Sequence, residues 1–160
     1  MRTRLVCLLL TLAAAGTGCA NPDPSEPPDH QDPTQEQLDL NRMYFTRVQR
    51  PQYSFTWQEN CFCPEESIKP IRITVKGADI TKAVYVADQQ PVSASVRSGL
   101  RTIEGVFDLI QARIDQHAEE VTVTYDAAYY PTSVFIDISK NVADEETSLH
   151  LSDFTSEAGQ

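Results

Sequence analysis

Six short segments of this 160-residue chain are predicted to be strands, and in two of them, 53–57 and 71–75, apolar and polar side chains alternate strictly, which is typical of strands that bury one face. Residues 53–57 show it most clearly, because Tyr53, Phe55 and Trp57 then share one side of the strand. Most connections between the segments are short, and consecutive strands joined by short loops pair as antiparallel hairpins. The other predicted strands are 71–75, 80–87, 120–125, 133–138 and 147–152.

Two segments carry apolar residues at helical spacing instead. The first follows a predicted N-cap at Thr34 and ends before Pro51. The second runs over 102–117 with Thr102 as its cap, and residues 88–101 before it read as a polar loop. The apolar positions are Leu40, Met43, Tyr44 and Val48 in the first helix, and Ile103, Val106, Phe107, Ile110 and Ile114 in the second.

The element order is therefore α-β-β-β-α-β-β-β. A sheet with one apolar face must bury that face, and the two amphipathic helices supply the cover. The sequence predicts the α+β class, with a single antiparallel β-sheet and helices packed on one face. One domain over 35–155 accommodates all of these elements, and residues 156–160 are predicted to be a disordered tail.

The N-terminus has the organisation of an export signal. Two arginines precede an apolar run over 5–15, which is too short to cross a bilayer as a helix. Small residues then lead to Cys19, an arrangement that resembles bacterial lipoprotein signals. Residues 1–18 are predicted to be a lipoprotein-type signal peptide, with Cys19 receiving the lipid. The alternative is an ordinary secretory signal that leaves Cys19 as a free thiol.

Residues 19–34 are predicted to be the lipidated cysteine and a tether. Five prolines fall within 20–34 and no large apolar side chain does, so this stretch cannot contribute to a core. The prediction is an exported protein held to a bacterial membrane by lipid, facing the periplasm or lying on the cell surface.

The formal charge of the chain is -10 at pH 7. Binding to nucleic acid depends on Lys and Arg side chains that neutralise phosphates, so a nucleic-acid partner is disfavoured. The same charge argues against peripheral binding to anionic lipid headgroups through protein side chains. The predicted membrane contact is therefore the lipid anchor.

Cys61 and Cys63 directly follow the first predicted strand. In an oxidising compartment a disulfide between them is expected, although two residues in a flat strand lie at the outer limit for a bridge, so the backbone must bend. The pair is either a local clip or a reducible disulfide with a redox role. A metal half-site is a further alternative, but His117 and His150 stand alone in the sequence.

An acidic connection precedes the last predicted strand. Clustered oxygen ligands on a loop can hold calcium, although the spacing does not match an EF-hand. The other interpretation is a solvated acidic turn that protects a sheet edge. The candidate ligands are Asp137, Asn141, Asp144, Glu145 and Glu146.

No catalytic set is evident in the sequence, because no serine lies in Gly-x-Ser-x-Gly and there is no glycine-rich phosphate loop. An enzyme is therefore disfavoured, and no cofactor other than calcium is predicted. The favoured function is a non-enzymatic domain that binds an envelope protein or a wall component. The alternative is a thiol-redox or metal-handling protein that uses Cys61 and Cys63.

Several of these motifs occur in an order that resembles one protein family. Trp57-x-x-Asn60-Cys61-Phe62-Cys63-Pro64 is followed by 71–77, 102–110, 130–133 and 141–146. This order is similar to the bacterial domain-of-unknown-function family numbered 6174, over roughly residues 36–155. The resemblance implies small, often lipid-anchored exported proteins and no assigned activity. It treats as a shared pattern the residues Cys61, Cys63, Pro131, Asp144 and Glu145.

Overall fold

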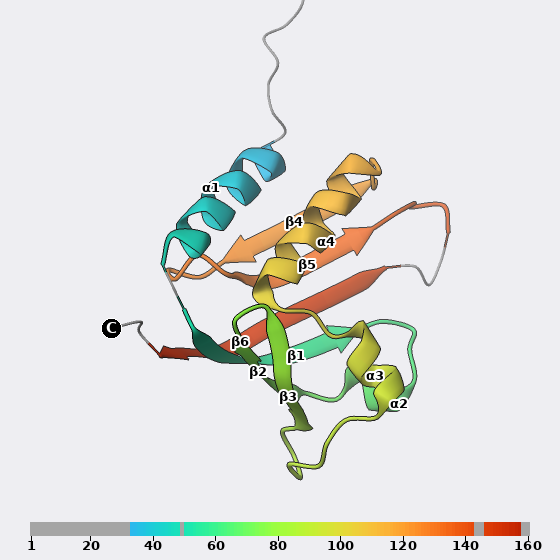
Figure 1. Ribbon diagram of the computed structural model, residues 1–160. Helices are drawn as coiled ribbons and strands as arrows, with labels where there is room; N and C mark the ends of the chain where they lie inside the picture. The colour runs from blue at the N-terminus through green and yellow to red at the C-terminus, as the bar shows by residue number, and fades with distance from the viewer. Residues whose placement is uncertain (1–32, 49, 143–145, 158–160) are drawn as a thin grey trace, which may run out of the picture. The chain divides into compact units, whose positions relative to one another are not determined.

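Ten helices and strands make up the described part of the computed structural model, which covers residues 33–48, 50–142 and 146–157 (Figure 1). These residues belong to one compact unit. The predicted signal peptide, Cys19 and most of the tether lie outside the described residues. The elements are α1 (Pro33–Arg47), β1 (Gln52–Asn60), α2 (Glu65–Ile68), β2 (Ile71–Lys76), β3 (Asp79–Tyr85), α3 (Ala94–Gly99), α4 (Ile103–Asp115), β4 (Glu120–Tyr125), β5 (Pro131–Asp137) and β6 (Thr147–Glu157).

The strands form one six-stranded antiparallel sheet in the order β3-β2-β1-β6-β5-β4, which confirms the predicted α+β class. Four of the strand pairs join strands that are consecutive in the chain. The β2–β3 turn places Gly77 at a φ of 61°, where a side chain would be strained. The first and last strands meet at the centre of the sheet. Trp57 of β1 lies opposite Ile71 on one side and Leu151 on the other, so the apolar faces of three strands coincide.

Helices α1 and α4 cover the apolar face of the sheet (Figure 1). The predicted stripe of α4 is confirmed for Ile103, Val106, Phe107 and Ile110, which are fully buried, while Ile114 is partly buried at its end. Thr102 caps this helix, because its hydroxyl accepts a 3.1 Å hydrogen bond from the N–H of Gly105. Burying each large apolar side chain contributes about 1.5–3 kcal/mol, so α4 is the main cover of the core.

The predicted apolar face of α1 is wrong. Leu38 and Phe45 are the buried residues, at 0% and 1% exposure, while the predicted set faces outward. Two polar contacts with α4 come from the same side of the helix as Leu38 and Phe45. The side chain of Gln35 donates a hydrogen bond to Gln111, and that of Arg42 donates one to Asp108. The helix carries apolar residues on two sides, and periodicity favoured the side with more of them. It also begins at Pro33, a residue suited to a first turn, so Thr34 is not its N-cap.

Strand β6 continues to Glu157, past the predicted domain end at residue 155, and residues 158–160 lie outside the described residues. A register shift against β1 falls between Ser54 and Thr56, where Asp153 of β6 has a φ of 52°. This bulge turns the ring of Phe154 inward, where it stacks on Tyr130 at 4.7 Å between centroids. Alternation alone places Phe154 on the opposite face.

Two short helices were not predicted. α3 lies within the segment predicted as a loop over 88–101, and Ser93 caps it by accepting a hydrogen bond from the N–H of Val96. α3 forms because Val96 is buried against the core, which a window of mostly polar residues conceals. α2 is a single turn after Pro64.

Candidate functional site

The structure joins Cys61 and Cys63 by a disulfide. Their Cα atoms lie 5.2 Å apart, inside the usual range, because the chain bends where β1 ends at Asn60. Phe62 between them is 87% exposed. The predicted bend is therefore present, and it turns an aromatic side chain into solvent.

The neighbours of this disulfide in the sequence are acidic. Glu59 precedes it, and Glu65 and Glu66 follow in the first turn of α2. Negative charge disfavours a thiolate, which is the form that attacks disulfides and binds metals. These surroundings suit a structural clip better than a redox pair.

The predicted calcium ligands are only partly described. Asp137 is buried, and its Oδ1 has no hydrogen-bond partner within the structure. Asn141 and Glu146 are exposed, whereas Asp144 and Glu145 lie outside the described residues. In the described ranges, no three His, Cys, Asp or Glu side chains come close enough to hold a metal. Calcium binding stays a prediction.

A lysine occupies part of the same region. Lys140 Nζ lies 3.6 Å from Oε2 of Glu120, the residue opposite Asp137 in the β4–β5 pair. The backbone N–H of Lys140 also donates to the carboxylate of Glu119. The ammonium of Lys140 thus pairs with the carboxylate that lies opposite Asp137 in the sheet register.

The two histidines in the described ranges, His117 and His150, form no metal-binding group with these residues. His150 is exposed on β6 between the buried Leu149 and Leu151, as its alternation predicts. His117 lies two residues beyond the end of α4 with a φ of 57°, and its Nδ1 is 3.3 Å from the carbonyl oxygen of Ile114. Neither histidine adds a ligand to the cysteine pair.

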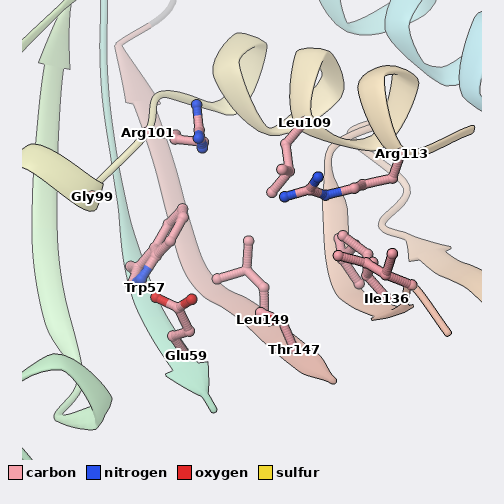
Figure 2. Close-up of a pocket in the computed structure, with 11 residues that line it drawn as sticks. Trp57, Glu59, Gly99, Arg101, Leu109, Arg113, Ile136, Thr147 and Leu149 are labelled. Carbon is pink, nitrogen blue, oxygen red and sulfur yellow. The ribbon is translucent and has the colours of Figure 1, made fainter. Parts of the chain in front are cut away.

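A pocket between α4 and the apolar face of the sheet was not predicted (Figure 2). Its volume is about 210 Å³. Strands β1, β5 and β6 form the floor, and α4 with the segment before it forms the roof. The lining residues are Trp57, Glu59, Gly99, Arg101, Leu109, Arg113, Val134, Ile136, Ile138, Thr147 and Leu149.

The floor and roof of this pocket differ in chemistry. The indole of Trp57 and the side chain of Leu149 give an apolar floor, and both residues are almost fully buried. Arg101 lies just before α4 and Arg113 in its last turn. Arg113 donates a 2.6 Å hydrogen bond to Oε1 of Gln116, and neither arginine forms a salt bridge with another described residue.

Glu59 supplies the acidic group of the pocket. It follows Trp57 by two residues on β1 and therefore faces the same side of the sheet. Partial burial raises the pKa of Glu59 above its ordinary value of 4.5, and the charge of Arg101 opposes this without cancelling it. The pocket therefore holds two guanidinium groups and one carboxyl group, and the pKa of that carboxyl group is raised.

Sequence reasoning missed this pocket for a physical reason. Trp57 was predicted to be core, which is correct, but the same ring also borders a cavity. The one local signal was Glu59, a charged residue on the buried face of an alternating strand. Arg101 and Arg113 meet the strand only through tertiary packing, which no spacing in the sequence reveals.

The pocket lies near the disulfide and the acidic connection. In the sheet register, Asn60 at the end of β1 faces Ser148, and Ile136 near the end of β5 faces Thr147. Cys61 follows Asn60 directly, and residue 146 directly precedes Thr147. The ends of β1 and β5 and the start of β6 thus lie at one end of the sheet (Figure 1).

Comparison with known proteins gives one result. Residues 37–156 match the model of a family of unknown function, DUF6174. No curated protein and no solved structure matches the chain. Within the described part of the chain, the helices fall short of the length and apolar content that crossing a bilayer requires.

Proposed function

Because the chain belongs to the DUF6174 family, whose description assigns no activity, we propose a function from the residues of the site. The protein is a non-enzymatic binding protein, exported and anchored to a bacterial membrane by lipid on Cys19. It binds a partner by accepting, in the pocket above Trp57, an apolar group that ends in a carboxylate.

The observation that carries this proposal is the charge of the pocket. Arg101 and Arg113 lie over an apolar floor, and no described carboxylate forms a salt bridge with either. Guanidinium groups bind carboxylates through two parallel hydrogen bonds, and such bonds are stronger away from bulk water. Glu59 is the one carboxyl group among the lining residues, so a ligand carboxylate supplies the counter-charge for the second guanidinium group.

The volume limits the size of the group. Pockets for drug-sized ligands measure about 300–1,000 Å³, and this one measures about 210 Å³. It accommodates one medium apolar side chain with its carboxylate, as at the C-terminus of a peptide. The floor formed by Leu149 and Ile136 supports an aliphatic side chain.

N-acetyl-leucine and N-acetyl-leucinamide are suitable probes, because they differ only in the carboxylate. Calorimetry on the purified full chain is expected to show weak binding of the acid and none of the amide. Arg113→Gln is expected to weaken binding of the acid about tenfold, as loss of a charged hydrogen bond implies. Arg47→Gln, on the outer side of α1, is the control and is expected to change nothing.

Two results would overturn the binding proposal. Equal affinity for the acid and the amide would show that the two arginines do not bind the carboxylate. Absence of binding to either probe, in a chain whose circular dichroism shows it folded, would remove the pocket as the site.

The proposed export and lipid anchor are tested separately. Intact mass of the protein purified from membranes is expected to show cleavage before Cys19 and added acyl chains. Retention of Met1 without acyl chains would contradict the anchor while leaving the pocket measurement unaffected.

A further inference from the structure

The outward side of α1 carries a continuous apolar surface, named here the α1 face. Leu40, Met43 and Tyr44 follow the i, i+3, i+4 spacing of one helix side, and Val48 directly follows the last helical residue, Arg47. The ring of Tyr129, from the β4–β5 turn, stacks on Tyr44 at 4.8 Å between centroids and extends the surface. The α1 face consists of Leu40, Met43, Tyr44, Val48 and Tyr129, which are 38–53% exposed.

This surface is not required by the fold. The core side of the same helix is already formed by Leu38 and Phe45. Single exposed apolar residues are ordinary, but a contiguous group of them marks contact with a protein or a membrane. We therefore expect the α1 face to contact a protein or a membrane.

The chemistry around the face suits the headgroup region of a bilayer. Two tyrosines lie beside aliphatic side chains, and the guanidinium of Arg47 lies 5.8 Å from the ring centroid of Tyr44. Arg47 is thus a basic residue beside this face, although the chain as a whole is strongly acidic. Amphipathic tyrosines and arginines with apolar stems are favoured at membrane–water interfaces.

The chain itself brings this surface to a bilayer. Thirteen residues, 20–32, separate Cys19 from Pro33 at the start of α1. At about 3.3–3.6 Å per residue, such a segment spans at most about 45 Å. α1 is the first described element after it, so a lipid on Cys19 keeps the α1 face at high effective concentration against the membrane.

We propose that the α1 face rests in the headgroup region of the membrane that holds the Cys19 lipid. The inference rests on the anchor in the proposed function. None of the residues that line the pocket belongs to the α1 face. Tyr129, in the β4–β5 turn, lies at the opposite end of the sheet from Glu59 and Thr147, so docking leaves the pocket accessible.

Quenching of an introduced tryptophan by lipid tests the proposal. The acylated protein is reconstituted into phosphatidylcholine vesicles with and without brominated acyl chains, as Tyr44→Trp and as Phe62→Trp. Phe62 is an exposed aromatic residue at the other end of the sheet, so it serves as the matched control. The buried Trp57 contributes a background emission, which is measured in the parent protein and subtracted.

Bromine is expected to lower the added emission of Tyr44→Trp about twofold, because a docked face penetrates about 5–10 Å, and to leave that of Phe62→Trp unchanged. Vesicle-bound protein in which Tyr44→Trp is not quenched would overturn the docking while the anchor stands. A blue shift without quenching, together with a cross-linked dimer, would assign the face to a second copy and also overturn it. Failure of the parent to stay on vesicles would instead refute the anchor.

Discussion

Tyr53 and Glu104 join the central strand to the start of the main helix. The hydroxyl of Tyr53 on β1 donates a 2.6 Å hydrogen bond to Oε2 of Glu104 in the first turn of α4. The hydroxyl oxygen of Tyr53 in turn accepts a 3.2 Å hydrogen bond from the N–H of Ile103, one of the donors that a helix leaves unpaired at its start. Burial and the carboxylate of Glu104 raise the pKa of Tyr53, so the phenol stays protonated.

Tyr53→Phe is expected to lower the free energy of unfolding by about 1–3 kcal/mol, because it leaves the N–H of Ile103 buried without an acceptor. Urea denaturation followed by circular dichroism measures the change. Tyr129→Phe removes a hydroxyl from a 40% exposed side chain and is expected to change little. Equal losses in the two variants would show that the Tyr53 hydroxyl has no special role.

Two leucines on α1 test which side of that helix is core. Leu38→Ala is expected to cost about 2–5 kcal/mol, because Leu38 is fully buried. Leu40→Ala, two residues away and 44% exposed, is expected to stay within about 0.5 kcal/mol. The two substitutions have the same helix propensity, so thermal or urea unfolding compares burial alone. A larger loss of stability in Leu40→Ala than in Leu38→Ala would instead support the buried side that the helical periodicity predicted.

Glu59 makes stability depend on pH. Its pKa is raised in the folded state, so the folded protein holds a proton that the unfolded chain releases above its ordinary value of 4.5. Stability therefore falls as pH rises from below that value through the raised pKa. Glu59→Gln removes this fall.

The stability of Glu59→Gln relative to the parent is thus expected to increase between about pH 4 and about pH 7. Urea denaturation at several pH values gives the difference, in which the unchanged groups cancel. Glu146→Gln, at an exposed carboxyl group, is expected to show a flat difference. A flat difference for Glu59→Gln as well would mean that the carboxyl group is solvated in the folded protein.

The fold was predictable wherever a segment has one apolar side. Tyr53, Phe55 and Trp57 could only form the inner face of a strand, and the stripe from Ile103 to Ile110 could only cover it. The prediction failed at α1, where both sides are apolar and only contact with α4 and the sheet selects Leu38 and Phe45. It also missed the β6 bulge, because a backbone of positive φ at Asp153 breaks the alternation before Phe154.

The site was less accessible to sequence reasoning than the fold. The Cys61–Cys63 bridge followed from the spacing and the predicted compartment, and the structure contains it. The pocket requires residues from β1, β5, β6 and α4 to converge, which depends on the pairing of the first and last strands. Trp57 and Arg113 are 56 positions apart in the sequence, so no local pattern links them.

The Cys61–Cys63 disulfide is expected to contribute little to stability. Cys61 and Cys63 close a very small loop, so cross-linking removes little freedom from the unfolded chain. Replacing both by serine is expected to cost less than about 2 kcal/mol, below the usual range for a native disulfide. Urea unfolding measures the loss, and the reduced parent protein is the control and should match the variant.

A redox titration of the same pair decides between a clip and a reactive disulfide. Thiol labelling in glutathione or dithiothreitol buffers is expected to give a midpoint below about -300 mV, as structural disulfides do. The acidic residues on both sides, Glu59 and Glu65, disfavour the thiolate that exchange requires. A midpoint well above that value, together with rapid exchange, would contradict the clip and favour the thiol-redox hypothesis. In that event the exposed Phe62 between the two sulfurs is the first residue a redox partner would meet.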